Sequence, residues 1–356
     1  MSSIAELLQA AEYIDWYERG MSKEWQDLPD ELILKILSYS EVIDLISCGQ
    51  VSKRTRNISR DTSLWVTANL EEKIVKTELL ELILSKGCKI LNISDSDIVG
   101  SLSSNIKSQL RVLNLSQSQW GFPVRNFRDW NWPGQVYYEE NIDVLEDLLS
   151  CCKSLQHLEM EGILITPRMA VGICMNGKTL QVLNLNHSFV DESSYYSGGL
   201  YDAVPNGNFQ TIIKCCQELK EVHLDDFNGD VGLPEENLDF LSANTPPNVE
   251  KLHLKNQDIW DHQIKILLSR CRKIKALSLE AHFMTDTSLS YIRKYLNLTL
   301  EELRLTDVND EISFNGFLEL KSIARHEILN LPPRPTGTKL KMVRTDIFKM
   351  DPLKVR

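Results

Sequence analysis

The chain has 356 residues, of which 42% are apolar and 25% are charged, so it is long enough for more than one folded unit and too rich in core-forming residues for a disordered protein. Its formal net charge of −11 argues against nucleic acid as the main ligand, because binding phosphates requires a basic face. The sequence has neither a long apolar run nor the basic and apolar start of a secretory signal, so we expect a cytoplasmic or nuclear protein without a membrane span.

Residues 1–22 are predicted to form an amphipathic helix. Ser3 and Glu6 have the spacing of a capping box. Apolar residues then follow at helical spacing, at Ile4, Leu7, Leu8, Ala11 and Ile14. This stretch resembles the Sin3-interaction helix of Max-partner repressors, and the resemblance implies binding to a Sin3 paired-helix domain. The alternative is a helix that packs beside the next module.

Residues 25–72 begin with a helical pattern. Pro29 suits the first turn of a helix, and Leu32 and Ile36 belong to the apolar stripe that follows it. A second helical pattern follows Ser40, which is its expected N-cap. We therefore expect a small helical module at this end of the chain.

The same residues carry a family pattern: Leu28-Pro29-Asp30-Glu31, Ile36-Leu37, Val51-Ser52-Lys53-Arg54 and Leu64-Trp65. This pattern resembles the F-box, although Thr55 stands where the family has tryptophan. The resemblance implies a three-helix module that binds a Skp-family adaptor, which links it to a cullin-RING ligase. The adaptor-binding residues that it implies are Leu28, Pro29, Leu32, Ile36, Val51, Leu64 and Trp65. The alternative is a helical cap that binds nothing.

Residues 73–330 repeat one apolar pattern, L-x-x-L-x-L. The copies start at Cys88, Leu110, Leu155, Leu180, Leu219, Val249, Ile274 and Leu300. The alternation places two apolar side chains on one face of a short strand, and a helical segment such as 142–149 precedes the strand. One strand and one helix cannot bury their apolar sides alone, so we expect the copies to stack into a solenoid with parallel strands on its concave face.

These copies resemble the cysteine-containing leucine-rich repeats. Cys152, Cys216 and Cys271 each lie three residues before the first apolar position of a copy, where a small apolar side chain suits a tight corner. Catalytic or metal-bound thiols are the alternative, but no C-x-x-C pair is present. The expected fold is therefore α/β, a three-helix F-box followed by a leucine-rich-repeat horseshoe.

The residue between the two inner apolar positions of each strand is expected to face the concave side, where solenoids bind partners. These residues are Asn92, Asn114, Glu159, Asn184, His223, His253, Ser278 and Arg304. Among them we predict that a protein substrate contacts Glu159, Asn184, His223, His253 and Arg304. The alternative for the two histidines is a metal ion, but no third ligand is close in sequence, so we predict no metal site and no cofactor.

Two insertions interrupt the repeats, at about 116–140 and 191–207. The first is rich in aromatic residues, among them Trp120, Trp130 and Trp132, and aromatic residues are favoured anchors of interfaces. We count these three tryptophans as candidate substrate contacts. The alternative is a loop that covers the flank of its own repeat.

Residues 331–356 form a basic tail that begins with a proline-rich break, Leu331-Pro332-Pro333. A basic segment beside an acidic body is able to lie across the concave face. A free tail is the alternative, because termini are often unattached.

The sequence offers no motif for catalysis: no G-x-S-x-G, H-E-x-x-H or glycine-rich phosphate loop is present. The expected function, implied by the F-box resemblance, is the substrate-recognition subunit of an SCF-type ubiquitin ligase, which recruits a protein target without catalysing a reaction. The alternative is a non-ligase leucine-rich-repeat scaffold.

Overall fold

The structure is a computed structural model, and it describes residues 25–103, 106–118, 139–190, 207–227, 232–255, 257–306, 311–313, 315–316 and 348–349. The helix expected within residues 1–22, the tryptophans at 120, 130 and 132, and most of the tail lie outside these ranges. None of the helices in the described ranges is long and apolar enough to cross a membrane.

The N-terminal module is helical, as expected. Its elements are the 3-10 turn η1 (Trp25–Asp27), the helices α2 (Asp30–Leu37), α3 (Val42–Val51) and α4 (Lys53–Ser59), and the 3-10 turn η2 (Thr62–Trp65). One detail of the prediction is wrong, because Glu41 rather than Ser40 is the N-cap of α3. The backbone N–H of Ser40 still donates to the carbonyl of Leu37 at 3.0 Å, so Ser40 belongs to the turn that ends α2.

Helix α4 explains why a threonine is tolerated at a position where the F-box pattern has tryptophan. The backbone N–H of Thr55 donates to Ser52 Oγ, and the backbone N–H of Ser52 donates to Thr55 Oγ1, both at 3.1 Å. This capping box satisfies two backbone donors at the start of the helix. Arg54 then ties α4 to the start of α2, because its Nε donates to Asp30 Oδ1 at 2.7 Å and its Nη2 to the carbonyl of Leu28.

A ten-stranded sheet forms the solenoid, and its strands follow chain order, while four further strands pair in two small sheets. Its strands are β1 (Thr67–Asn69), β3 (Ile90–Asn92), β5 (Val112–Asn114), β6 (His157–Glu159), β8 (Val182–Asn184), β10 (Glu221–His223), β11 (Lys251–Leu254), β12 (Ala276–Glu280), β13 (Glu302–Thr306) and β14 (Phe348–Lys349). All neighbours are parallel except β14, which pairs antiparallel with β13 and so places two tail residues on that edge. Two small parallel sheets pair β2 (Ile74–Lys76) with β4 (Asp97–Val99) and β7 (Leu164–Ile165) with β9 (Phe189–Val190).

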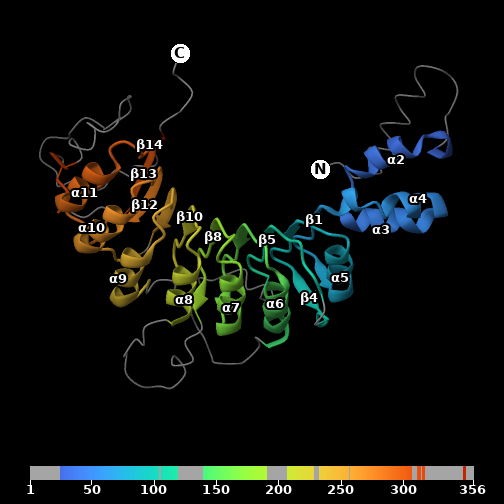
Figure 1. Ribbon diagram of the computed structural model, residues 1–356, viewed down its shortest axis with the longest axis horizontal. Helices are drawn as coiled ribbons and strands as arrows, with labels where there is room; N and C mark the ends of the chain where they lie inside the picture. The colour runs from blue at the N-terminus through green and yellow to red at the C-terminus, as the bar shows by residue number, and fades with distance from the viewer. Residues whose placement is uncertain are drawn as a thin grey trace, which may run out of the picture.

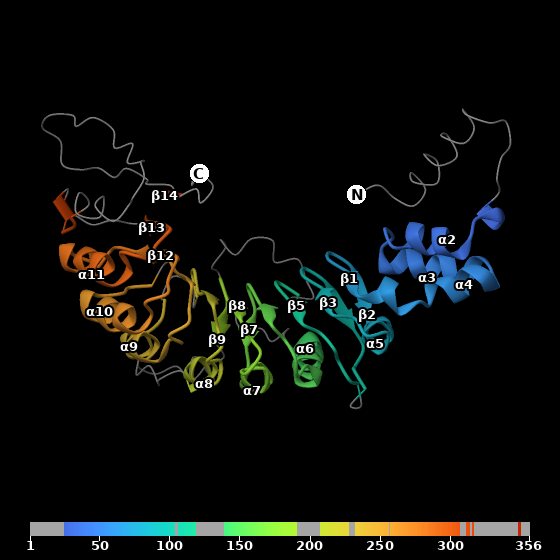
Figure 2. The same ribbon diagram turned by 45° about the horizontal axis from the view of Figure 1, so that its top comes forward.

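Helices cover the outer side of this sheet. They are α5 (Thr77–Ser85), α6 (Glu139–Cys151), α7 (Pro167–Met175), α8 (Gly207–Cys215), α9 (Glu235–Asn244), α10 (Asp261–Arg270) and α11 (Asp286–Leu296). Figure 1 shows the result as an open arc, with strands along its inner side, helices along its outer side and the helical N-terminal module at one end. Figure 2 shows the same order after rotation. The predicted solenoid with parallel strands on its concave face is confirmed.

The structure adds one repeat that the sequence pattern did not reveal. Strand β1 pairs with β3 in the same register as later neighbours, and Trp65, Ala68 and Leu70 take the three apolar positions of its copy. The pattern escaped detection because tryptophan and alanine replace two of the leucines. Trp65 therefore ends the N-terminal module and starts the first repeat, so the two parts share a core residue.

The corners between helices and strands are filled as the cysteine positions predicted. Cys152 Sγ donates to the carbonyl of Leu148 at 3.1 Å, and burial raises the pKa of Cys216 and Cys271 to about 12. In the copy that starts at Leu180, which lacks this cysteine, Asn176 Nδ2 donates to the carbonyl of Cys152 at 3.0 Å. All eight cysteines are reduced. Cys152, Cys216 and Cys271 are buried with raised pKa values, so these three thiols are packing groups rather than reactive ones.

Candidate functional site

The helical N-terminal module exposes apolar side chains that a soluble domain would normally bury. Leu32 on α2 is 51% exposed and Val51 at the end of α3 is 77% exposed. Tyr39 and Ile43 of the same module are also exposed. Other residues of these helices, such as Ile33, form its buried core. A group of exposed apolar side chains in one small module is typical of a surface that binds another protein.

The seven residues expected to bind an adaptor divide by exposure. Pro29, Leu32 and Val51 are exposed, while Leu28 and Ile36 are half-buried. Leu64 and Trp65 are buried in the core. An effect of these last two on a partner would therefore act through the fold of the module.

Trp65 is held in place by a hydrogen bond in which its Nε1 donates to the carbonyl of Ser59 at 2.7 Å. Sequence reasoning missed two exposed residues of this surface, Tyr39 and Ile43, because neither belongs to the family pattern. The signal available for them was their position in the chain, since Tyr39 lies in the turn after α2 and Ile43 lies off the stripe of α3 that faces the core.

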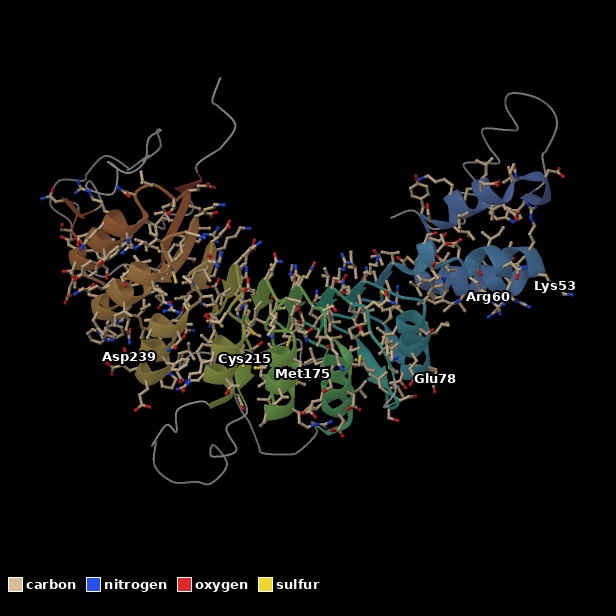
Figure 3. The ribbon with its side chains drawn as sticks, in the orientation of Figure 1. Lys53, Arg60, Glu78, Met175, Cys215 and Asp239 are labelled. Atoms are coloured by element: carbon tan, nitrogen blue, oxygen red, sulfur yellow. The ribbon has the colours of Figure 1, made fainter. Side chains whose placement is uncertain are left out.

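The second candidate surface is the concave face of the sheet. Strand pairing aligns Glu159, Asn184, His223, His253 and Arg304 in one row, with Ser278 between the last two. The row continues toward the N-terminal module through Asn114, Asn92 and Asn69. The predicted register is therefore confirmed. Figure 3 places the labelled Met175 and Cys215 on the opposite, helical side.

Glu159 lies in a hydrogen-bonded pair at the middle of the row. His157, on the same strand, is within 2.8 Å of it through Nε2 and Oε1. The hydrogen bond from His157 holds the pKa of Glu159 below its ordinary value, despite partial burial. Glu159 is therefore a fixed carboxylate on the concave face. Sequence reasoning missed His157, which occupies the strand position two residues earlier.

His223 and His253 stack against each other from neighbouring strands, with ring centroids 4.4 Å apart. Burial lowers the pKa of both imidazoles, and for His223 the proximity of His253 lowers it further. Each ring still lies near a carboxylate, with His223 Nε2 3.9 Å from Glu221 and His253 Nδ1 4.0 Å from Asp225. The pair therefore offers neutral ring nitrogens to a partner.

A metal ion at these histidines finds no support in the described ranges, which contain no group of three or more histidine, cysteine or acidic side chains able to hold one. The stacked rings instead form a flat polar surface with carboxylates at its margin. Such a surface suits recognition of a protein segment.

The end of the row is basic. Arg304 Nη2 donates to Glu302 Oε1 at 3.1 Å, while its buried Nε has no hydrogen-bond partner. Asn184 uses its Oδ1 to accept from the backbone N–H of Asn186 at 3.0 Å. The row thus changes from neutral amides through a carboxylate and two imidazoles to a guanidinium. That order of groups favours one orientation of a bound chain.

The two surfaces belong to different parts of the fold. A model of the F-box-like family matches residues 25–71. The described residues thus combine an F-box-like domain with a leucine-rich-repeat type of solenoid, an architecture typical of non-catalytic interaction modules. An F-box domain implies binding to a Skp-type adaptor.

Two solved structures are similar to this chain. Internalin C2 from Listeria monocytogenes matches with 14% sequence identity and a TM-score of 0.42, over 74% of this chain and 92% of that chain. The leucine-rich repeat-containing protein LegL7 from Legionella pneumophila matches with 12% identity and a TM-score of 0.33, over 74% of this chain and 92% of that chain.

Proposed function

We propose that this chain is the substrate-recognition subunit of an SCF-type ubiquitin ligase. In this function the F-box-like domain binds a Skp-family adaptor and, through it, a cullin-RING ligase. The solenoid holds a protein target on its concave face. The single observation that carries the proposal is the F-box-like domain at residues 25–71 with Leu32 and Val51 exposed on its surface.

The mechanism requires no catalytic group in this chain. A receptor that binds the ligase at one end and a target at the other raises the local concentration of target lysines near the bound conjugating enzyme. The shared core residue Trp65 supports this function, because it links the two modules without a long flexible connection. A fixed link limits the range of positions that a bound target can take relative to the adaptor.

A closer relationship is part of the proposal. Among F-box proteins with leucine-rich repeats, the run from Leu155 to Gly162 looks most similar to S-phase kinase-associated protein 2. We also propose that the protein acts in the cytoplasm or nucleus, where thiols stay reduced, because all eight cysteines are free.

The ligase assignment is tested by co-purification of adaptor and cullin with the full chain. A double variant, Leu32→Asp with Val51→Asp, places two charges on the exposed apolar surface. The matched control is Ile74→Asp with Val171→Asp, since these apolar residues of the solenoid are 74% and 59% exposed. We expect the first variant to lose both partners and the control to keep them. Undiminished adaptor binding by the first variant contradicts the assignment.

The target surface is tested separately from the adaptor surface. Replacing His223 and His253 with alanine is expected to weaken the binding of a captured target at least about tenfold, because buried polar contacts at an interface centre dominate affinity. The binding of the adaptor is expected to stay unchanged. A second variant that lacks residues 119–138 tests the aromatic insertion, including Trp120, Trp130 and Trp132. Normal turnover of every captured target by both variants would place target binding elsewhere.

A non-ligase scaffold is the competing function. It would hold partners on the solenoid without a cullin in the complex. Affinity capture with the Leu32→Asp and Val51→Asp variant in a parallel sample separates the two, because this variant leaves the first repeat and its core residue Trp65 in place. Loss of cullin together with stabilisation of a captured partner supports the ligase, whereas a wild-type complex that contains no cullin supports the scaffold.

The N-terminal segment carries a second partner proposal, binding to a Sin3 paired-helix domain. It rests on the resemblance of residues 4–14 to the Sin3-interaction helix. A peptide of residues 1–20 is titrated against that domain, with Leu8→Pro as the control because proline breaks a helix. Affinity no tighter than that of the control rules this partner out.

A further inference from the structure

The repeat geometry gives the solenoid two long edges of different character. Apart from β14, the strands of the solenoid are parallel, so they all point the same way. Each helix from α5 to α11 follows one of these strands and is itself followed by the next strand. The helix N-termini therefore gather along one edge and the helix C-termini along the other. We call the first the helix-entry edge and the second the helix-exit edge.

Charge is separated between these edges. Among the described residues, the helix-exit segments contain fourteen basic and three acidic side chains, and the helix-entry segments contain fourteen acidic and four basic ones. The helix-exit segments are 82–89, 100–103, 106–111, 148–156, 172–181, 212–220, 241–250, 267–275 and 293–301. The helix-entry segments are 70–80, 93–99, 115–118, 142, 160–170, 185–188, 207–210, 224–227, 232–238, 255, 257–264, 281–289 and 311–313. A chain with a net charge of −11 thus carries a basic edge.

Helix dipoles explain part of this separation. Acidic side chains are favoured near helix N-termini and basic ones near C-termini, each by about 0.3–1 kcal/mol. The effect falls off within the last turn, so it does not account for basic residues in the turn beyond a helix. The turn after α10 has three such residues, Arg272, Lys273 and Lys275.

The basic charge is densest at the last two repeats. We define the C-terminal basic patch as Arg270, Arg272, Lys273, Lys275, Arg293 and Lys294. All six are exposed, their own segments contain one acidic residue, Glu301, and the preceding helix-exit segment ends with Glu250. Lys275 pairs with Glu250 at 2.6 Å. The patch thus keeps a clear positive excess.

Some members of the patch are fixed by their own fold. Arg270 Nε donates to the carbonyl of Thr245 at 2.8 Å, and Lys273 Nζ donates to Asn248 Oδ1 at 2.7 Å. Both bonds reach back to the preceding repeat. They hold the side chains in place, so less conformational entropy is lost when a partner binds.

An aromatic ring lies within the patch. The guanidinium of Arg272 is 5.6 Å from the ring centroid of Tyr295, and Lys294 Nζ is 5.1 Å from the same centroid. Leu298, in the turn that follows α11, is 83% exposed. The patch therefore combines oriented cations with apolar surface.

We propose that the C-terminal basic patch binds a short acidic segment of a protein partner, one in which aspartate or glutamate alternates with an apolar residue. The carboxylates would pair with Arg272, Lys273 and Lys294, and the apolar residue would pack on Tyr295 and Leu298. This surface is distinct from the F-box-like domain and from the concave row.

Charge complementarity decides between a short acidic segment and a nucleic acid. Screened interactions reach about 8–10 Å at physiological salt. A segment of a few residues stays within that distance of the patch. A long polyanion would extend over the acidic remainder of the molecule and be repelled there.

The test measures fluorescence anisotropy of a labelled peptide with alternating glutamate and leucine against the full chain. The variant is Arg272→Glu, Lys273→Glu and Lys294→Glu, which leaves Arg270 and Lys275 in place. The matched control is Lys153→Glu, Lys178→Glu and Lys214→Glu, which changes the net charge equally at exposed positions of the same edge. We expect the patch variant to bind the peptide at least about tenfold more weakly and the control to change affinity less than about threefold. Melting curves by circular dichroism verify that both variants are folded.

Three outcomes overturn the proposal. The first is equal weakening in both variants, which would show a general charge effect. The second is equal affinity of the wild type for a peptide in which serine replaces glutamate. The third is tighter binding of a single-stranded oligothymidylate of the same length, which would identify a nucleic acid as the partner. None of these measurements involves the adaptor, so failure here leaves the ligase proposal standing.

Discussion

The F-box-like domain and the solenoid differ in whether their functional surfaces expose apolar or polar side chains. The repeats bury the apolar residues of their L-x-x-L-x-L pattern, except for the half-buried Leu300 of the last copy, and present amides, carboxylates and imidazoles on the concave face. The F-box-like domain buries one stripe of α2 and α3 and leaves Leu32 and Val51 exposed. The first surface is stable in water and suits recognition by hydrogen bonds, whereas the second gains free energy when another apolar surface covers it.

This difference predicts which surface is permanently occupied. Exposed apolar groups favour a stable complex, so the F-box-like domain suits a constitutive partner such as an adaptor. A polar row binds and releases with smaller changes in buried apolar area. Under the proposed function, the polar row suits a target that is exchanged after each transfer of ubiquitin.

The largest expected effect contrasts a buried leucine with an exposed one. Leu183 is fully buried between β6 and β10, so Leu183→Ala is expected to destabilise the chain by about 2–5 kcal/mol. Leu32→Ala on the exposed surface is expected to change stability by less than about 0.5 kcal/mol. Urea midpoints followed by circular dichroism compare the two. Equal destabilisation by both would mean that Leu32 belongs to the core.

A smaller effect is expected from the cap of α4. Ser52→Ala removes the side-chain oxygen that accepts from the backbone N–H of Thr55, while the bond from the Ser52 backbone N–H to Thr55 Oγ1 is retained, and it is expected to cost about 1 kcal/mol. Ser47→Ala is the control, because Ser47 is exposed inside α3 and its Oγ donates only to the carbonyl of Ile43. Thermal melting of the two variants gives the difference. If Ser47→Ala destabilises as much as Ser52→Ala, the cap contributes nothing specific.

The smallest effect concerns pH. Burial lowers the pKa of His223 and His253 below the ordinary value of 6.5, so the unfolded chain binds protons that the folded chain rejects. The part of the stability that depends on these two histidines is therefore fully present above pH 6.5. It is lost as the pH falls through their lower pKa in the folded chain. Glu221, Asp225 and Glu302 partly oppose this shift, and Lys251 and Arg304 add to it.

The measurement is the melting temperature between pH 7.5 and 5.5. We expect the melting temperature to fall between pH 7.5 and pH 5.5 by about 1–2 °C less in the double variant His223→Gln with His253→Gln than in the wild type. His262→Gln, at an exposed position on α10, serves as the control and should follow the wild type. A double variant that loses as much as the wild type would show that the stacked pair carries no pH dependence.

The solenoid was predictable because its repeats are redundant. An error at one copy does not change the register set by the others, so the row from Asn92 to Arg304 followed from spacing alone. Features that occur once were harder to predict. The first repeat was hidden by Trp65 and Ala68, and the cap of α3 was displaced by a backbone hydrogen bond of Ser40 that no side-chain pattern reveals.

The sites follow the same division. Strand spacing placed His223 and His253 side by side, but their stacking depends on ring orientation, which only the structure gives. The family pattern of the F-box did not separate contact residues from core residues. It grouped Val51, which is exposed, with Trp65, which is buried, because a motif records that a residue matters without recording how.

The central claim is that one chain binds an adaptor and a target through separate modules. The most direct test is calorimetric titration of a Skp-family adaptor into the full chain and two variants. We predict that Leu32→Asp with Val51→Asp weakens adaptor affinity at least about a hundredfold, because charges replace apolar contacts, while His223→Ala with His253→Ala leaves it unchanged. Equal affinity in all three proteins, or a loss caused by the histidine variant alone, would contradict the account.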